Sequence, residues 1–217
     1  ILGAMSTENP FADPHLIWCE VGFAVADVQR VTHDAPEWGP VSVTLPDDLQ
    51  NAVPKRRAEF LAGRFCAALA LRQLGLPESV PRQGRAPVWP AGVAGSISHS
   101  KDRAIAAVSR HHRGVGLDCE GYVADDRAMQ LSASIFTEAE SRLRPNTLPY
   151  GRFFTLVFSA KESLYKALSP RLNRVLDFHE VTLTDLAPGE MGLLFEGHPH
   201  RARFRLSGKD VLTLVVA

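Results

Sequence analysis

Two long helical patterns, each followed by a series of short strand-like segments, constrain the fold of this chain more than any other feature. The first pattern begins at Pro54, because proline suits the first turn of a helix, and is expected to end at Gly75. The second covers roughly residues 153–168. A helix can bury its apolar stripe on a sheet formed by the strands that follow it. We therefore predict an α+β chain of two similar halves, each a long helix packed on a small antiparallel sheet, meeting near Gly121.

Short segments with alternating or continuous apolar residues predict the strands. Two of them precede the first helix, at residues 17–25 and 41–45. The others follow the two helices, at residues 95–100, 104–109, 114–120, 180–185, 192–196, 202–206 and 210–216. The expected domains are therefore residues 1–121 and 122–217. Between the second half's start and its long helix, Thr137 and Glu140 predict a capping box that opens a short helix.

Composition places the protein among globular proteins without a strong charge preference. Of 217 residues, 45% are hydrophobic, and 24 basic residues balance 24 acidic ones. This balance argues against a nucleic-acid partner that would need a basic face. Three cysteines without a C-x-x-C spacing indicate reduced thiols and no zinc site.

The sequence predicts neither a membrane span nor a signal peptide. No run of about 18 apolar residues is present, so we expect no membrane span. The first residues, ILGAM, lack the features of a signal peptide, and Met5 is expected to be the natural start. We therefore expect a cytoplasmic protein.

Two carboxylates share one face of the predicted strand GVGLDCE. Because side chains alternate along a strand, Asp118 and Glu120 lie on one face while Leu117 and Cys119 lie on the other. Adjacent carboxylates repel unless a positive charge stands between them, and Mg²⁺ suits such oxygen ligands. The alternative is an exposed acidic end of a strand.

The second long helix contains the segment FSAKESLYKA. Glu162 and Lys166 are four residues apart and share one face, which most often indicates a surface ion pair. Lys161 lies within an apolar stripe, so we expect its ammonium group to extend from the edge of the core toward water or an anion. The helix would then present one carboxylate and two ammonium groups close together.

The first long helix has a basic edge. Arg56, Arg57 and Arg64 lie near one side of it, and Arg82 and Arg85 in the following loop would add to the same patch. Arginine binds phosphate in a forked geometry, so this patch is a candidate phosphate site. The alternative is a solvated basic face.

Five segments taken together resemble one family. KRRAEFLAGR, RAPVWP, GSISHS, GVGLDCE and FSAKESLYKA, in this order, are similar to motifs of the Sfp-type phosphopantetheinyl transferases, especially the siderophore-synthesis, enterobactin synthase component D-like branch. The resemblance covers roughly residues 54–168. It implies a pseudodimeric α+β fold and transfer of the 4′-phosphopantetheine arm of coenzyme A to a serine of an apo acyl, peptidyl or aryl carrier protein. It also implies a Mg²⁺ cofactor, with Mn²⁺ as a substitute, and a monomer is expected.

The resemblance also implies roles for individual residues. Asp118 and Glu120 would hold Mg²⁺, and Glu162 would be a third ligand, the base, or both. Lys161 and Lys166 would contact the pyrophosphate, with Lys166 assisting catalysis. The residues expected to bind the phosphates of coenzyme A are Arg56, Arg64, Arg85, Ser98 and His99. Ser98 and His99 are adjacent on a strand and point to opposite faces, so a phosphate site fits them better than a nucleophile and its base.

Two rival functions and one docking surface follow from the same residues. A Mg²⁺-dependent nuclease would use similar carboxylates, and a non-catalytic module could bind carrier proteins. Residues 121–136 contain Met129, Leu131, Ile135 and Phe136, which either pack as core or form an exposed patch where a carrier docks.

Overall fold

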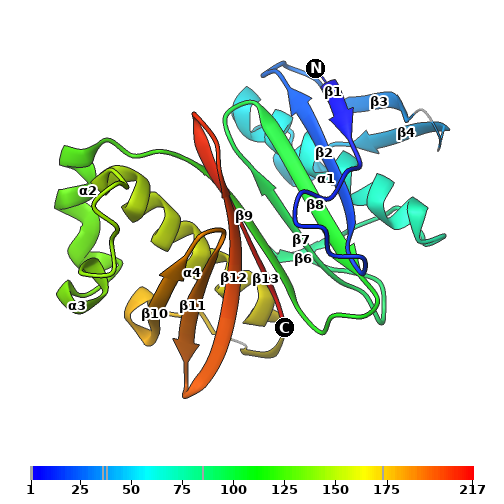
Figure 1. Cartoon of the computed structure of the whole chain (residues 1–217). Helices are drawn as coiled ribbons and strands as arrows, with labels where there is room; N and C mark the ends of the chain where they lie inside the picture. Colours follow the sequence, from blue (N-terminus) through cyan, green and yellow to red (C-terminus); the bar gives the residue numbers. More distant parts are fainter. Residues whose placement is uncertain (1, 36, 38, 85, 173) are drawn as a thin grey trace. The chain divides into compact units, whose positions relative to one another are not determined.

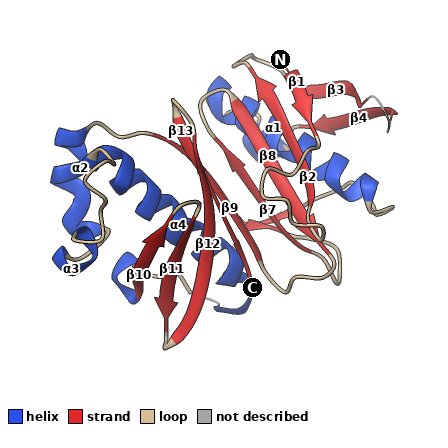
Figure 2. Cartoon of the chain, viewed as in Figure 1, coloured by secondary structure: helices blue, strands red, loops and turns tan. Residues whose placement is uncertain are grey.

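The chain folds into two units, residues 1–112 and 113–217, each built from a long helix on an antiparallel sheet (Figures 1 and 2). The computed structural model describes residues 2–35, 37, 39–84, 86–172 and 174–217. The mixed α+β fold expected from the sequence is confirmed. Among the described residues, no helix is long and apolar enough to cross a membrane.

The N-terminal unit is a four-stranded sheet covered by one long helix. Helix α1 (Pro54–Gln73) starts with proline at its first turn and is followed by Gly75 at φ +66°, as the sequence predicts. It packs against β8 (Arg103–Ser109) and β2 (Ile17–Phe23) of the sheet. The sheet order is β1 (Leu2–Ser6), β2 (Ile17–Phe23), β8 (Arg103–Ser109) and β7 (Ala94–His99). The smaller elements are β3 (Arg30–Ala35), β4 (Gly39–Thr44), the 3-10 turn η1 (Asp47–Leu49), β5 (Arg82–Gln83) and β6 (Ala86–Pro87).

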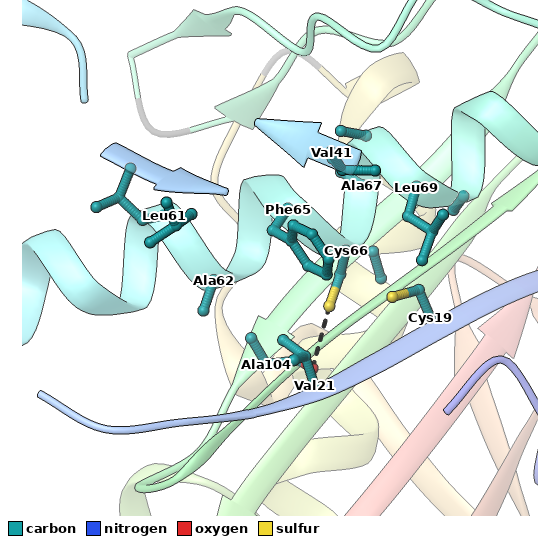
Figure 3. Packing of buried hydrophobic residues seen from close by; sticks show 14 of the residues in the cluster. Cys19, Val21, Val41, Leu61, Ala62, Phe65, Cys66, Ala67, Leu69 and Ala104 are labelled. Carbon is teal, nitrogen blue, oxygen red and sulfur yellow. Dashed lines mark hydrogen bonds between the residues drawn. The ribbon is translucent and has the colours of Figure 1, made fainter. Parts of the chain in front are cut away.

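The core of this unit lies between α1 and the sheet. Phe65, Cys66 and Leu69 of α1 pack with Cys19 of β2, and the Cys66 thiol donates to the carbonyl of Ala104 at 3.4 Å (Figure 3). All three cysteines are buried free thiols, as the sequence predicts.

The C-terminal unit is a five-stranded antiparallel sheet packed against the second long helix. Helix α4 (Tyr150–Leu172) is longer at both ends than predicted and packs against β9 and β13. The sheet order is β10 (Val181–Ala187), β11 (Glu190–Phe195), β12 (His198–Leu206), β13 (Asp210–Val216) and β9 (Val115–Gly121). The remaining elements are α2 (Asp125–Leu131), η2 (Ser132–Ser134), α3 (Glu138–Ser141) and η3 (Phe178–Glu180). The predicted capping box of Thr137 and Glu140 opens α3.

The pairing of β9 corrects the predicted domain boundary. This strand pairs along its whole length with β13, with Cys119 opposite Leu212 and Asp118 opposite Thr213. The D-x-E strand therefore belongs to the C-terminal unit, and the division falls between residues 112 and 113 instead of at Gly121. The prediction was wrong because strand order along the chain does not determine which strand is a partner in the sheet.

Two features bring α4 close to β9. A Cβ atom added at Gly116 would collide with the carbonyl oxygen of Ser163 in α4. The hydroxyls of Ser159 and Ser163 also meet the hydroxyl of Thr213 on the neighbouring strand, at 2.9 and 2.8 Å. The helix backbone thus lies directly on the strand, which places side chains of α4 beside the carboxylates of β9.

Candidate active site

Asp118 and Lys166 form the centre of the site in the C-terminal unit. Asp118 is buried on β9, and the ammonium nitrogen of Lys166 on α4 donates to its Oδ1 at 2.7 Å and to the carbonyl of Leu117 at 3.0 Å. The sequence predicted that Lys166 shares a helix face with Glu162. It did not reveal that Lys166 reaches back to the strand and pairs there with Asp118.

Glu120 and Glu162 complete a group of three interacting carboxylates. Burial raises the pKa of Glu120 to about 7, helped by the charges of Asp118 and Glu162 and opposed by Lys166. Burial also raises the pKa of Glu162, where Lys166 again opposes the effect and Asp118 adds to it. Lys166 thus interacts with all three carboxylates, whose charges repel one another and favour a cation beside them. The expected common face of Asp118 and Glu120 is consistent with this coupling.

The donor set fits a hard divalent cation, although its side chains are not yet gathered around one point. Carboxylate oxygens are the ligands that Mg²⁺ prefers. Within the described residues, no group of three or more His, Cys, Asp or Glu side chains stands in a metal-binding arrangement. The role of Asp118, Glu120 and Glu162 as metal ligands therefore stays a prediction.

The side chain of Lys161 is buried and does not extend from the edge of the core, although its position in the helix predicts that it does. Its side chain is 1% exposed, and its ammonium nitrogen donates to Glu140 Oε1 at 2.9 Å. It also donates to the carbonyls of Ile135 and Phe178, at 2.8 and 3.0 Å. The prediction that this ammonium extends to water or an anion is wrong, because three acceptors inside the unit take its three donors. The three hydrogens of this ammonium group are thus occupied, which argues against the expected pyrophosphate contact of Lys161.

Glu140, the partner of Lys161, is held by several donors. Burial alone would raise the pKa of this carboxyl group. Hydrogen bonds from Lys161 and from the backbone of Thr137 and Leu183 outweigh burial and hold the pKa of Glu140 below its usual value. The pair therefore joins α4, α3 and β10 through one buried carboxylate.

The N-terminal unit contains a small cationic cavity of about 120 Å³. Its charged lining includes Arg56, Arg64 and His99, three of the residues that the sequence assigned to phosphate binding. Burial, and then the charge of Arg56, lower the pKa of Arg64 to about 10. Arg64 also lies over the ring of Phe60, 5.0 Å from its centroid, and its buried Nε has no hydrogen-bond partner among the described residues. These features indicate a site for an anion.

The other predicted phosphate ligands are placed differently. Ser98 is buried and does not line this cavity, because alternation along β7 turns Ile97 and His99 toward it and Ser98 away. Arg85 lies outside the described residues, and Arg82, which the sequence placed in the same basic patch, lines the cavity. Phosphate binding by Ser98 and Arg85 stays a prediction.

A second cavity, of about 600 Å³, adjoins the first and was not found from the sequence. The two share Phe60, Arg64 and Arg82, and the second is lined further by residues 42–44, by Asp48 and by residues 78–81. These residues come from a strand and a loop far apart in the chain, and no local pattern marks them as neighbours.

The predicted docking segment is partly core and partly surface. Ile135 and Phe136 are buried in the core of the C-terminal unit, and Leu131 is half-buried against it. Met129 on α2 is 60% exposed. The expectation of an exposed patch is therefore wrong for Ile135 and Phe136, while Met129 remains available to a partner.

Comparison with known proteins assigns the family. A family described as 4′-phosphopantetheinyl transferase N-terminal domain matches residues 45–109, and the 4′-phosphopantetheinyl transferase superfamily matches residues 114–216. The interval between the matches contains the boundary between the two units.

Several curated relatives align with most of the chain. Enterobactin synthase component D of Salmonella typhi is 38% identical over 182 residues, which is 79% of this chain and 76% of that protein. Enterobactin synthase component D of Escherichia coli K12 is 47% identical over 122 residues, 55% of this chain and 58% of that protein. The 4′-phosphopantetheinyl transferase Svp of Streptomyces mobaraensis is 39% identical over 159 residues, 69% of this chain and 64% of that protein. With two family matches and these relatives in agreement with its fold, the chain belongs to the 4′-phosphopantetheinyl transferase superfamily and is a transferase.

Proposed function

We propose that this protein transfers the 4′-phosphopantetheine arm of coenzyme A to a serine hydroxyl of an apo carrier protein and releases adenosine 3′,5′-bisphosphate. The observation that carries the proposal is the ion pair of Asp118 with Lys166, with Glu120 and Glu162 near enough to interact electrostatically with both, in a chain of this family. Relatives named enterobactin synthase component D further support a carrier protein of siderophore synthesis as the partner.

The chain's own residues supply a base and a cation for this reaction. The serine oxygen forms a bond to the phosphorus that bears pantetheine, and the bond from that phosphorus to the bridging pyrophosphate oxygen breaks. Glu162, whose pKa is raised by burial, would accept the serine proton. Lys166 would leave Asp118 far enough to neutralise the departing phosphate. Such transfer depends mainly on alignment and charge compensation, which these groups provide.

Asp118, Glu120 and Glu162 would also hold Mg²⁺, or Mn²⁺ as a substitute. Their oxygen donors suit the ion, and their excess negative charge needs a cation. When bound, the ion would act as a Lewis acid on the pyrophosphate oxygens.

The two cavities of the N-terminal unit would recognise the nucleotide. Arg56, Arg64 and His99 would bind the 3′-phosphate in the smaller cavity. The larger cavity is of a size that accepts a nucleoside, and it adjoins the smaller one as a nucleoside adjoins its phosphate.

The test is modification of purified apo carrier proteins. Fatty-acid, polyketide and nonribosomal-peptide carriers are incubated with the protein, coenzyme A and Mg²⁺, and intact-mass spectrometry follows the gain of one phosphopantetheine. Glu162→Gln should abolish the gain. Glu138→Gln is the matched control, because Glu138 is an exposed glutamate of the same unit paired only with Arg142 among the described residues. No modification of any carrier by the wild-type protein would refute the proposal. Light scattering on the same preparation tests the expected monomer.

A further inference from the structure

One arginine of the cationic cavity is held by an aromatic ring. Arg64 on α1 is buried and lines both cavities of the N-terminal unit. Its guanidinium carbon lies 5.0 Å from the ring centroid of Phe60, one turn earlier on the same helix, a distance at which a cation and a ring attract each other. Phe60 also lines both cavities, and it packs against the core of the unit. The ring is therefore a fixed support for the guanidinium group.

Two other arginines of α1 are held by carboxylates. Arg57 pairs with Asp27 and donates to the carbonyl of Gln50 at 3.1 Å. Arg72 forms a forked pair with Glu78, with nitrogen–oxygen distances of 2.7 and 2.8 Å. In both cases a carboxylate compensates the positive charge and occupies N–H donors, so neither arginine is prepared to bind an anion.

The carboxylates that line the two cavities pair with cations other than Arg64. The pairs are Asp48 with Arg82, Glu78 with Arg72 and Glu59 with Lys55. Among the described residues, Arg64 therefore has no carboxylate partner, and its buried Nε has no hydrogen-bond partner. The pKa of Arg64, about 10, still leaves its guanidinium group positively charged at neutral pH. Its charge is thus available to a ligand.

An aromatic support suits an arginine that binds an anion. The face of a ring attracts a cation through its quadrupole, and the attraction is stronger where water is excluded. The ring neither neutralises the cation nor uses the N–H donors in the guanidinium plane, which remain for a forked contact with one phosphate. A carboxylate in the same place would compete with the phosphate for both the charge and the donors.

We propose that Phe60 is a positioning residue, whose ring holds the guanidinium group of Arg64 in the smaller cavity so that its N–H donors bind a terminal phosphate monoester. The proposal rests on the proposed function, in which that monoester is the 3′-phosphate of coenzyme A. It makes an apolar side chain a determinant of selectivity for this phosphate.

The test compares two ligands that differ only in this phosphate. Calorimetry measures Kd for coenzyme A and for dephospho-coenzyme A in the wild-type protein, Phe60→Leu, Arg64→Met and the double variant. Phe60→Leu should weaken coenzyme A about fivefold, the scale of one partly desolvated cation–π contact, and should change dephospho-coenzyme A less than about twofold. Because the ring acts through Arg64, the double variant should prefer coenzyme A no less than Arg64→Met alone. In the transfer assay of Phe60→Leu, KM for coenzyme A should rise and kcat should stay unchanged.

Three further variants separate the ring from the rest of the helix. Phe60→Tyr keeps the aromatic face and should bind both ligands like the wild-type protein. Phe60→Glu places a carboxylate one turn from Arg64 and should weaken coenzyme A more than Phe60→Leu, because the guanidinium charge is then compensated. Phe65→Leu is the matched control, since Phe65 lies on α1 but is buried in the core and lines neither cavity (Figure 3). It should lower the free energy of unfolding and leave the ratio of the two Kd values unchanged.

The outcomes are distinguishable. An unchanged preference for coenzyme A in Phe60→Leu, or an equal loss of affinity for both ligands, would overturn the positioning role. Normal coenzyme A affinity in Phe60→Glu would overturn it as well, and neither result would touch the proposed function if the wild-type protein modifies a carrier. A wild-type protein that binds neither ligand would overturn both proposals.

Discussion

Replacing Lys161 by methionine should destabilise the C-terminal unit severely without touching the reacting groups. The change removes the cation from a carboxylate, Glu140, that is 3% exposed, and it removes a donor from the carbonyls of Ile135 and Phe178. Breaking one side of a buried ion pair costs about 3–5 kcal/mol of unfolding free energy. This is a large part of the roughly 5–15 kcal/mol that holds a typical domain folded.

Urea unfolding followed by circular dichroism measures the loss. Lys161→Met with Glu140→Gln should recover part of it, because the glutamine oxygen can still accept from the backbone N–H of Leu183 without a buried charge. Arg142→Met is the matched control. It breaks an ion pair with Glu138 in the same unit, but both side chains are more than 70% exposed, so the loss should stay below about 1 kcal/mol. A stable Lys161→Met variant that has lost transfer activity would refute this reasoning and restore a ligand contact for Lys161.

Three other predictions test the carboxylates and the exposed surface. Asp118→Asn should lower kcat for carrier modification by about 10²-fold or more while circular dichroism shows an intact fold, since under the proposed function it removes a charge needed at the reacting pyrophosphate. Glu120→Gln in the presence of EDTA should raise unfolding free energy at pH 8 but not at pH 5. The pKa of Glu120 is raised to about 7 in the folded protein. Its favourable contribution to the free energy of unfolding is therefore complete below the pKa that Glu120 has in the unfolded chain, and it is lost as the pH rises through 7. Allowing for solvent screening, the gain in the free energy of unfolding at pH 8 should be about 1–2 kcal/mol, measured by urea unfolding. An equal gain at pH 5 would contradict the raised pKa of Glu120. Met129→Asp should raise KM for the carrier and leave Kd for coenzyme A unchanged, because Met129 is exposed; unaltered carrier kinetics would place docking elsewhere.

Local signals in the sequence predicted the two long helices and most strands of the two sheets, but they missed β1, β3 and α2 and did not reveal which strands pair. Pro54 and Gly75 mark the ends of α1 because helix termini have strong residue preferences. The alternation that puts Asp118 and Glu120 on one face is equally local. The pairing of β9 with β13 is not, since strands nearly a hundred residues apart meet there.

The case of Lys161 shows the same limit inside the site. The sequence places it correctly on an apolar stripe and identifies Glu140 as part of a capping box. Nothing in either pattern says that the carboxylate of the capping box is the acceptor for the lysine, because this contact depends on how α3 packs against α4. The cavity residues 42–44, Asp48 and 78–81 were missed for the same reason.

The membership of β9 in the C-terminal unit has a consequence for how such an enzyme can be altered. Asp118, Glu120, Glu162 and Lys166 all fall within one uninterrupted stretch of about half the gene, whereas the arginine cavity is encoded entirely upstream of residue 113. Under the proposed function, a crossover at the junction of residues 112 and 113 would exchange the unit proposed to recognise the nucleotide between relatives and keep the proposed reacting groups together in their original setting. A crossover at Gly121 would separate the D-x-E strand from β13, its partner in the sheet, and from the helix that carries Lys166. Chimeras made at these two points differ by only nine residues, yet only the first should inherit a complete set of reacting groups from one parent.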